Sequence, residues 1–575
     1  MIHFYLVFSI QLIIVLLLKI LQMLQVKNLE ISFKNAPSVI KNVSFDLHQN
    51  KIVGIVGESG SGKSITSLAI LGLLPKSATI KGQILFEEQD LLAYSNDQFQ
   101  KIRGSKIAMI FQEPMSSLNP TLTCGIQVAE ILQQHTNLSS EEIKKEVINL
   151  FNKVKLPRAE SIYNSYPHQI SGGQKQRVMI AMAVACKPKL LIADEPTTAL
   201  DVTVQKEIIL LLKELQQEYK MSIIFISHDL ALVSEIADTV VVMHKGKIIE
   251  QGLADEIFLN PKENYTKALI NSKPNIKKRF KILPTVTDFI KNTVNKTIYT
   301  DDERTEFHQK IYKNLPLLEI KNLHKNFITN TSWFNKPTIV KAVNNVSFKI
   351  YEGETLGLVG ESGCGKTTLS RTILQLESAT SGEIIYKGKD ITKLSKSDFK
   401  NLRKEIQIIF QDPFSSLNPR ITVGNAILEP MKVHNILNSL KERKEYVLQL
   451  LEKVGLEPEH FDRYPHEFSG GQRQRIGIAR TIVLQPKLII CDESVSALDV
   501  SVQAQVLNLL NQLKAEFNFT YIFISHDLSV VKYMADQLVV MNKGKLEEIA
   551  DADEIYNNPK TTYTKTLIDA IPKGL

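Results

Sequence analysis

The sequence predicts two tandem α/β domains of the phosphate-loop type, and three observations carry this prediction. The pattern G-x-x-x-x-G-K-[ST] occurs at residues 57–64 and again at residues 360–367, and it is typical of a loop that binds nucleotide phosphates. Each copy follows a short β-branched run and precedes a segment with helical periodicity. Further motifs then follow each copy in the same order, offset by about 300 residues, so we expect a duplicated domain.

The elements expected in each half are short buried strands with polar residues at their carboxyl ends. Two runs lead into the glycine loops, at 51–56 and 354–359, and helices follow at 64–74 and 367–376. Apolar runs at 190–193 and 488–491 each end in a carboxylate pair, and the strands at 222–226 and 521–524 each lead into Ser-His-Asp. Strands that present polar residues at one edge predict an open parallel sheet with its site on that edge.

Length and composition allow several domains and exclude some kinds of site. A chain of 575 residues is too long for one compact core. Its four cysteines form no C-x-x-C pair, so neither a zinc site nor a disulfide framework is indicated. The net charge of +8 fits a nucleic-acid partner, an anionic membrane surface, or simply a lysine-rich solvated surface.

The repeat divides the chain into two domains, at residues 23–272 and 316–575, joined by a linker at 273–315. The linker contains a basic cluster, Lys277, Lys278 and Arg279, and shows no regular core pattern. We therefore expect a solvated spacer. Residues 1–22 are nearly all apolar. They are long enough to contact or cross a membrane, and they are equally well explained as translated sequence upstream of a start at Met23.

The glycine loops supply the chemistry of phosphate binding. The first consists of Gly57, Glu58, Ser59, Gly60, Ser61, Gly62, Lys63 and Ser64, and the second of Gly360, Glu361, Ser362, Gly363, Cys364, Gly365, Lys366 and Thr367. Glycines let main-chain N–H groups close around phosphate oxygens. Lys63 and Lys366 are expected to reach the β and γ oxygens, and the hydroxyls of Ser64 and Thr367 to bind Mg²⁺.

The carboxylate pairs predict metal binding and catalysis of hydrolysis. Asp194 and Asp492 end apolar strands, where a carboxylate can hold Mg²⁺. Glu195 and Glu493 follow directly and are candidates for the base that orients the attacking water and accepts its proton. The recurrence of each pair at the same distance before a histidine argues against solvated strand ends.

Further motifs in both halves resemble those of ATP-binding-cassette (ABC) ATPases. Ile-Ser-Gly-Gly-Gln at 170–174 and Phe-Ser-Gly-Gly-Gln at 468–472 resemble the family signature. Gln112 and Gln411 resemble the Q-loop glutamine, which the family also uses at the metal, and His228 and His526 resemble the switch histidine. The resemblance implies a RecA-like core sheet, an antiparallel β subdomain and a helical subdomain in each domain, with ATP and Mg²⁺ as ligands.

The resemblance also implies that each glycine loop is closed by the signature of the other domain. The expected signature contacts are Ser171, Gly172, Gly173 and Gln174, and Ser469, Gly470, Gly471 and Gln472. Each set begins a helix, where free N–H groups can meet the γ-phosphate. Phe33 and Phe327 lie where the family stacks an aromatic ring on adenine. No cysteine follows either domain closely, so we expect no iron–sulfur cluster.

A finer resemblance is to ATPases of the dipeptide, oligopeptide, nickel and glutathione importers, above all to fused two-domain members such as those for microcin C and glutathione. It rests on the Q-loop extensions at 112–120 and 411–419 and on the C-terminal motif at 558–567. The resemblance implies ATP hydrolysis coupled to transport, with two transmembrane permease subunits and a substrate-binding protein as partners. It places the chain peripherally at the cytoplasmic face of a bacterial inner membrane, with no direct contact to the transported substrate and none to nucleic acid.

The alternative is a soluble tandem ABC ATPase that acts on the ribosome or on nucleic acid. Such proteins usually carry a long charged helical hairpin between their domains. The linker here contains Pro274 and Pro284 and lacks that periodicity, which favours the importer.

Overall fold

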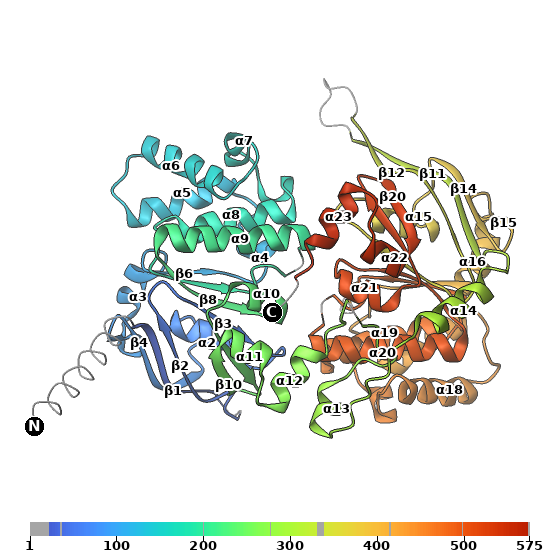
Figure 1. The fold of residues 1–575 in the computed structure, drawn as a ribbon, viewed down its shortest axis with the longest axis horizontal. Coiled ribbons are helices and arrows are strands. Elements are labelled where there is room, and N and C mark those ends of the chain that lie inside the picture. Colours follow the sequence, from blue (N-terminus) through green and yellow to red (C-terminus); the bar gives the residue numbers. More distant parts are fainter. Residues whose placement is uncertain are drawn as a thin grey trace, which may run out of the picture. The chain divides into compact units, whose positions relative to one another are not determined.

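The computed structural model describes residues 22–34, 37–198, 200–276, 278–329, 338–412, 416–496 and 498–572. The chain forms two compact units, and the main division falls between Ile270 and Asn271. We call them cassette 1 and cassette 2 and describe each by itself (Figure 1). Of the apolar N-terminal segment, residues 1–21 lie outside the described residues.

Cassette 1 is built on a six-stranded sheet with the strand order β10-β9-β3-β8-β7-β6. Neighbouring strands are parallel except for the edge strand β10, which is antiparallel to β9. The strands are β3 (Ile52–Val56), β6 (Ile107–Ile110), β7 (Leu190–Asp194), β8 (Ser222–Ser227), β9 (Thr239–His244) and β10 (Lys247–Leu253). Strands β3, β7 and β8 are buried along their whole length, as expected for parallel strands covered on both faces.

The strand order brings the predicted site together. Strand β8 lies between β3, which leads into the glycine loop, and β7, which ends at Asp194. The carboxyl ends of these three parallel strands therefore share one edge of the sheet. His228 follows β8 directly and so lies between the other two motifs.

A second sheet, β2-β1-β4-β5, forms an antiparallel subdomain. Its strands are β1 (Gln22–Phe33), β2 (Ile40–His48), β4 (Ala78–Phe86) and β5 (Gln89–Asp90). Side chains from β1 and β2, including Leu29 and Val43, join one buried cluster with Ile55 of the core sheet and Ile70 of the helix after the glycine loop. Apolar burial therefore fixes this subdomain against the core sheet.

The helices of cassette 1 include a separate helical subdomain, which Figure 1 shows at the end of the cassette opposite β1, β2 and β4. This subdomain contains α5 (Cys124–His135), α6 (Ser140–Lys153) and α7 (Ala159–Tyr163). Ser139 caps the start of α6 in a capping box with Glu142, which satisfies two main-chain donors. The other helices are α2 (Lys63–Ile70), α3 (Asn96–Ile102), α4 (Pro114–Ser117), α8 (Gly172–Val184), α9 (Val202–Tyr219), α10 (Leu230–Ile236), α11 (Ala254–Leu259) and α12 (Asn264–Asn271), with 3-10 turns η1 (Leu91–Ala93) and η2 (Pro167–Gln169).

Cassette 2 repeats both sheets, in the orders β16-β17-β18-β13-β19-β20 and β12-β11-β14-β15. The strands are β11 (Leu318–Thr329), β12 (Thr338–Ile350), β13 (Thr355–Val359), β14 (Ser381–Tyr386), β15 (Lys389–Asp390), β16 (Ile406–Ile409), β17 (Leu488–Asp492), β18 (Thr520–Ile524), β19 (Gln537–Asn542) and β20 (Lys545–Asp551). The helices are α13 (Val286–Ile290), α14 (Asp301–Ile311), α15 (Lys366–Ile373), α16 (Lys396–Glu405), α17 (Val423–Val433), α18 (Leu440–Lys453), α19 (Gly470–Ile482), α20 (Val500–Phe517), α21 (Leu528–Met534), α22 (Ala552–Asn557) and α23 (Thr562–Asp569), with 3-10 turns η3 (Pro458–Asp462) and η4 (Pro465–Glu467).

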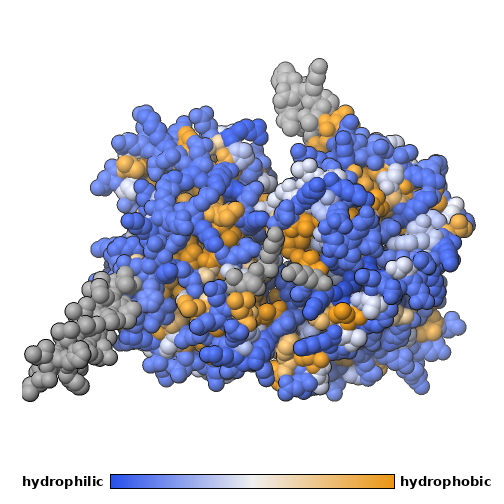
Figure 2. Space-filling model, in the orientation of Figure 1, coloured by the Kyte–Doolittle hydropathy of each residue, from blue (hydrophilic) through white to orange (hydrophobic). Residues whose placement is uncertain are grey.

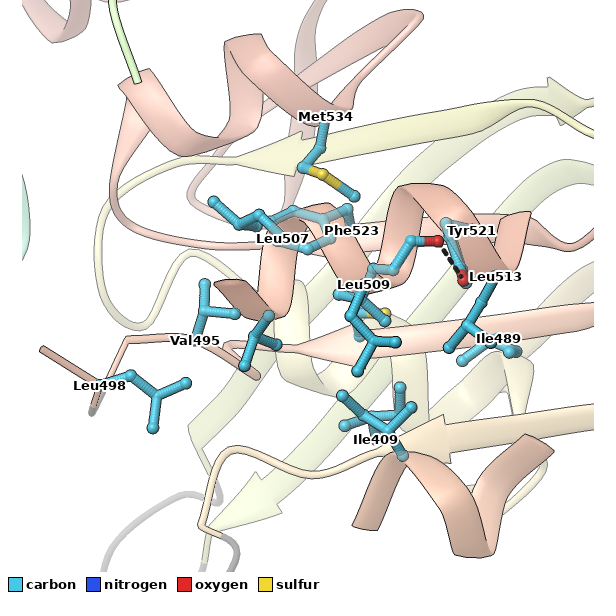
Figure 3. Close-up of a cluster of buried hydrophobic side chains, with 14 of the residues drawn as sticks. Ile409, Ile489, Val495, Leu498, Leu507, Leu509, Leu513, Tyr521, Phe523 and Met534 are labelled. Atoms are coloured by element: carbon cyan, nitrogen blue, oxygen red, sulfur yellow. Dashed lines mark hydrogen bonds between the residues drawn. The ribbon is translucent and has the colours of Figure 1, made fainter. Parts of the chain in front are cut away.

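Helix α20 packs against the core sheet of cassette 2. Leu507, Leu509 and Leu513 of this helix lie among side chains of β16, β17 and β18 (Figure 3). The buried hydroxyl of Tyr521 donates a hydrogen bond of 3.0 Å to the main-chain oxygen of Leu510. That bond satisfies the one polar group that this ring brings into the core.

The predicted fold class is confirmed, and the elements differ from expectation mainly at helix ends. The helices after the glycine loops end at Ile70 and Ile373, earlier than expected. Shortly after these ends the chain adopts left-handed backbone conformations, at Gly72 (φ +60°) and at Gln375 (φ 55°). A residue with positive φ interrupts the α-helical hydrogen-bond ladder.

The linker segment (residues 273–315) packs on cassette 2, although the sequence predicted a solvated spacer. It contains α13 and α14, and Leu283 is 1% exposed. Its anchors are charged. Arg304 Nη2 lies 3.0 Å from Asp551 Oδ2, and the guanidinium of Arg279 donates a hydrogen bond of 2.8 Å to the main-chain oxygen of Ala535. Hydropathy patterning gives no signal for a segment held by ion pairs, which explains the difference.

The surface of both units that faces the viewer in Figure 2 is mostly hydrophilic, with scattered apolar residues. Within the described part of the chain, none of the helices combines the length and the apolar character needed to span a bilayer.

Candidate nucleotide site

The glycine loop of each cassette wraps around its own lysine. Lys63 Nζ donates to the main-chain oxygens of Gly57 (2.8 Å) and Glu58 (2.9 Å). Lys366 Nζ repeats these bonds to Gly360 (2.7 Å) and Glu361 (2.9 Å). Glycine is required at the first position because a Cβ on Gly57, at φ +153°, would lie 2.2 Å from the main-chain oxygen of Met243. Both loops thus have the tight turn and the buried cation that phosphate binding needs.

The expected metal ligands of cassette 1 are neighbours. Ser64 Oγ donates to Asp194 Oδ1 at 3.2 Å, and Asp194 is 4% exposed. Burial raises the pKa of Asp194, and the adjacent Glu195 acts in the same direction, against the hydrogen bond from Ser64 and the charge of Lys63. A buried carboxylate beside a hydroxyl fits Mg²⁺, which usually takes one or two protein oxygens together with phosphate oxygens.

Cassette 2 has the equivalent residues at the same places in its elements, with Asp492 at the end of β17 and Thr367 directly after the loop lysine. Burial and the charge of Glu493 raise the pKa of Asp492 to about 6, although Arg371 and Lys366 oppose them. A bound cation would remove this unfavourable charge, so this set of ligands fits Mg²⁺ as well.

Glu195 has a strained backbone conformation, and three side chains contact its carboxylate. Its φ is 48°, and Oε2 lies 3.0 Å from His228 Nδ1, 3.1 Å from Gln112 Nε2 and 2.9 Å from Thr198 Oγ1. Burial alone would raise the pKa of Glu195, but the hydrogen bond and charge of His228, with the bond from Thr198 and the charge of Lys63, lower it to about 2. Positive φ at a non-glycine residue costs energy and is concentrated at functional sites.

Glu493 repeats the strain but not all of the contacts. Its φ is 49°, and Oε2 lies 2.8 Å from Gln411 Nε2 and 3.5 Å from His526 Nδ1. Burial opposes the shift, but His526 and Lys366 lower the pKa of Glu493. Ser496, which corresponds to Thr198, donates instead to the main-chain oxygen of Glu493 at 2.7 Å.

Both signature sequences begin a helix. Ser171 caps α8 in a reciprocal capping box with Gln174, and Ser469 caps α19 in the same way with Gln472. Both serines are exposed. The first turn of each helix therefore carries main-chain N–H groups suited to an anion.

The two predicted adenine contacts differ in their surroundings. Phe33 is half-buried and packs against the cluster between the β subdomain and the core sheet. Phe327 is 37% exposed, with the ammonium of Lys325 4.9 Å from its ring centroid. Both assignments stay predictions.

Sequence reasoning missed three residues that contact these sites. Thr198 could not be identified from the sequence, because its hydrogen bond to Glu195 depends on the backbone turn that follows Glu195. Tyr265 and Tyr563 reach the glycine loops from helices near the end of each cassette. Both tyrosines stand in a repeated Tyr-Thr-Lys sequence, and the repeat was the signal that could have identified them.

Known proteins that resemble this chain are ATP-binding subunits of transporters, in agreement with the nucleotide site described above. The family model for ABC transporters matches residues 40–198 and 343–496, and the model for the C-terminal region of oligopeptide/dipeptide transporters matches residues 249–292 and 548–574. The glutathione import ATP-binding protein GsiA of Escherichia coli (strain K12) is 44% identical over 569 residues, covering 96% of this chain and 89% of that protein. GsiA of Pectobacterium atrosepticum is 42% identical over 564 residues, covering 96% and 90%.

Among solved structures, the ATP-binding cassette MJ0796 bound to ADP and Pi matches 41% of this chain and 98% of its own, with 27% identity and a TM-score of 0.37. The two family matches and the full-length relatives confirm the resemblance seen in the motifs. The chain belongs to the ABC transporter family, as a two-cassette ATPase whose hydrolysis of ATP is coupled to transport.

Proposed function

We propose that this ATPase powers the import of glutathione or small peptides through a membrane permease. The observation that carries the proposal is 44% identity to a glutathione import ATPase across both cassettes and 96% of the chain. The C-terminal region typical of oligopeptide and dipeptide transporters follows both matches to the ABC transporter model and supports the same class of substrate.

In the proposed mechanism, Lys63 and Lys366 leave the loop carbonyls to hold the β- and γ-phosphates of ATP. Glu195 and Glu493 orient the attacking water and accept its proton, and His228 and His526 fix these carboxylates. Mg²⁺ bound by Asp194 and Asp492, with Ser64, Thr367, Gln112 and Gln411, would neutralise charge on the phosphates.

The signature turns are proposed to complete nucleotide binding. The N–H groups that follow Ser171 and Ser469 would meet the γ-phosphate. Under this proposal ATP binding brings the cassettes together, and hydrolysis releases them. The covalent connection between them raises their effective concentration for each other.

The proposed partners are two transmembrane permease subunits, which the cassettes drive, and a substrate-binding protein that delivers the substrate. We propose a peripheral location at the cytoplasmic face of a bacterial inner membrane. No observation separately favours the alternative role on the ribosome or nucleic acid.

Co-purification followed by transport tests the proposal. The chain is purified with its permease, and both are placed in proteoliposomes with the cassettes and ATP on the inside and the substrate-binding protein on the outside. Uptake of labelled glutathione and of a labelled dipeptide is then measured. We expect ATP-dependent uptake that the double variant Lys63→Ala/Lys366→Ala abolishes. ATP hydrolysis without uptake of either compound would contradict the proposed substrate class.

A further inference from the structure

The C-terminal helix of each cassette reaches the glycine loop through a tyrosine. Tyr265 on α12 and Tyr563 on α23 occupy equivalent positions in the two cassettes. The main-chain N–H of Glu361 donates to the hydroxyl of Tyr563 at 3.1 Å, and that of Glu58 donates to the hydroxyl of Tyr265 at 3.4 Å. The same contact is therefore present in both cassettes.

The residue that each tyrosine contacts also accepts two hydrogen bonds within the glycine loop. The main-chain oxygen of Glu58 accepts hydrogen bonds from Lys63 Nζ at 2.9 Å and from the N–H of Ser61 at 3.1 Å. In cassette 2 the oxygen of Glu361 accepts from Lys366 Nζ at 2.9 Å and from the N–H of Cys364 at 3.2 Å. The N–H group that each tyrosine binds belongs to the peptide unit whose carbonyl group is that of Gly57 or Gly360, and this oxygen also accepts a hydrogen bond from the loop lysine.

The same N-terminal end of each helix is also anchored to the core sheet. Glu250 on β10 accepts the N–H groups of Lys262 (2.8 Å) and Glu263 (3.2 Å) just before α12. Glu548 on β20 accepts the N–H groups of Lys560 (3.0 Å) and Thr561 (3.3 Å) just before α23. A carboxylate at a helix start is stabilised by the N-terminal amides. The first turn of each helix is thereby connected both to the edge of the core sheet and to the phosphate loop.

We propose that Tyr265 and Tyr563 are positioning residues that raise the affinity of each cassette for nucleotide by holding the loop in its binding shape. Each hydroxyl fixes the second residue of the loop, and through that residue the loop lysine. The C-terminal region of each cassette contributes in this way to ATP binding itself.

The surroundings of the two tyrosines differ, because the first has a neighbouring histidine and the second cassette has an asparagine at that position. In cassette 1 the ring of His244 packs against that of Tyr265 at a tilt of 40°, with the ring centroids 4.2 Å apart, and His244 Nδ1 lies 3.5 Å from Glu58 Oε2. Asn542 occupies the equivalent position in cassette 2, where its amide donates to Glu547. Cassette 1 thus has a second connection between the same elements, and cassette 2 depends more on its tyrosine.

The test removes only the hydroxyl groups from the full-length protein. Tyr265→Phe, Tyr563→Phe and the double variant are compared for kcat, for KM for ATP, and for equilibrium binding of a fluorescent ATP analogue. The matched control is Tyr556→Phe, because that hydroxyl donates to the main-chain oxygen of Leu528 away from the loop. Phe258 occupies the position in cassette 1 that is equivalent to Tyr556, so we expect phenylalanine to be tolerated there.

We expect KM and the dissociation constant to rise about three- to tenfold in the double variant, the range that corresponds to one lost hydrogen bond per site. The effect of Tyr563→Phe should exceed that of Tyr265→Phe, kcat should stay within about twofold, and the thermal midpoint without nucleotide should match that of Tyr556→Phe. Nucleotide binding as tight as in Tyr556→Phe would overturn the proposal. So would a fall in kcat without a change in affinity, or a loss of thermal stability larger than that of the control.

Discussion

The carboxylate of Glu195 receives a hydrogen bond that the carboxylate of Glu493 does not. Thr198 donates to Glu195 Oε2 at 2.9 Å, whereas Ser496 donates to a main-chain oxygen. We predict that Thr198→Ala lowers kcat for ATP hydrolysis about three- to tenfold, because a candidate base that is less well oriented abstracts the proton less efficiently. Thr198→Ser should restore the rate, and steady-state phosphate release measures both. An equal loss in Ser496→Ala would show that the bond to the carboxylate is not the cause.

Replacing both candidate bases should separate ATP binding from hydrolysis. We predict that Glu195→Gln/Glu493→Gln binds ATP but hydrolyses it at least about a hundredfold more slowly, since general base catalysis contributes this much. Filter binding and phosphate release measure the two properties. Glu214→Gln is the control, because it removes only the surface ion pair with Lys155. Full turnover in the double variant would rule out the assigned bases.

Helix α14 attaches the linker segment to cassette 2 through an ion cluster. Arg304 is 11% exposed and contacts Asp551 and Asp553, which are 36% and 33% exposed. We predict that Arg304→Leu lowers the free energy of unfolding of cassette 2 by about 2 kcal/mol, less than the cost of breaking a fully buried pair. Denaturant titration of the full chain measures this change. Lys281→Ala, which breaks the more exposed pair with Glu303, should cost less than about 1 kcal/mol.

The same end of cassette 2 buries a carboxyl group, that of Glu354. It accepts hydrogen bonds from the hydroxyl of Tyr312 at 3.0 Å and the N–H of Tyr351 at 2.8 Å. Burial raises the pKa of Glu354 to about 7, with Asp536 acting in the same direction and Lys514 against it.

Because the folded state binds this proton more tightly than the unfolded chain, the stability that it contributes is complete below about pH 4.5 and is lost as pH rises through about 7. We predict that Glu354→Gln flattens the fall in the stability of cassette 2 between pH 5 and pH 8. Urea unfolding at several pH values measures the slope. An unchanged slope would assign the pH dependence to another group. Lys51 occupies the equivalent position in cassette 1, so we do not expect this pH dependence of stability there.

The strands and motif residues were predictable because their signals are local. The apolar runs that end at Asp194 and Asp492 define both a strand and the place where its polar tip must lie. The linker segment was not predictable, since Arg279 and Arg304 find their partners more than 200 residues later in the chain. Tyr265 was missed because its partner Glu58 lies 207 residues earlier, and the repeated Tyr-Thr-Lys sequence marks the position without indicating which loop it contacts.

Duplication gives the molecule two similar cassettes, but the linker segment belongs structurally to only one of them. Asp551, which pairs with Arg304, has Leu253 as its equivalent in cassette 1, and Lys514, whose ammonium lies 5.5 Å from the ring centroid of Phe307, has Gln216. Cassette 1 therefore lacks two of the charged residues that contact the linker segment. We expect the linker segment to stabilise cassette 2 alone.

We predict that a fragment of residues 271–575 unfolds about 5 °C or more above a fragment of residues 316–575, because the shorter one leaves Asp551 and Asp553 without Arg304. Differential scanning calorimetry of the two purified fragments measures this difference. The matched control compares residues 23–270 with residues 23–315, in which the added segment lacks the counterparts of Asp551 and Lys514 and should leave the midpoint unchanged. Equal midpoints for the two fragments of cassette 2 would mean that the ion cluster does not stabilise it, and that the linker segment is the spacer its sequence predicts.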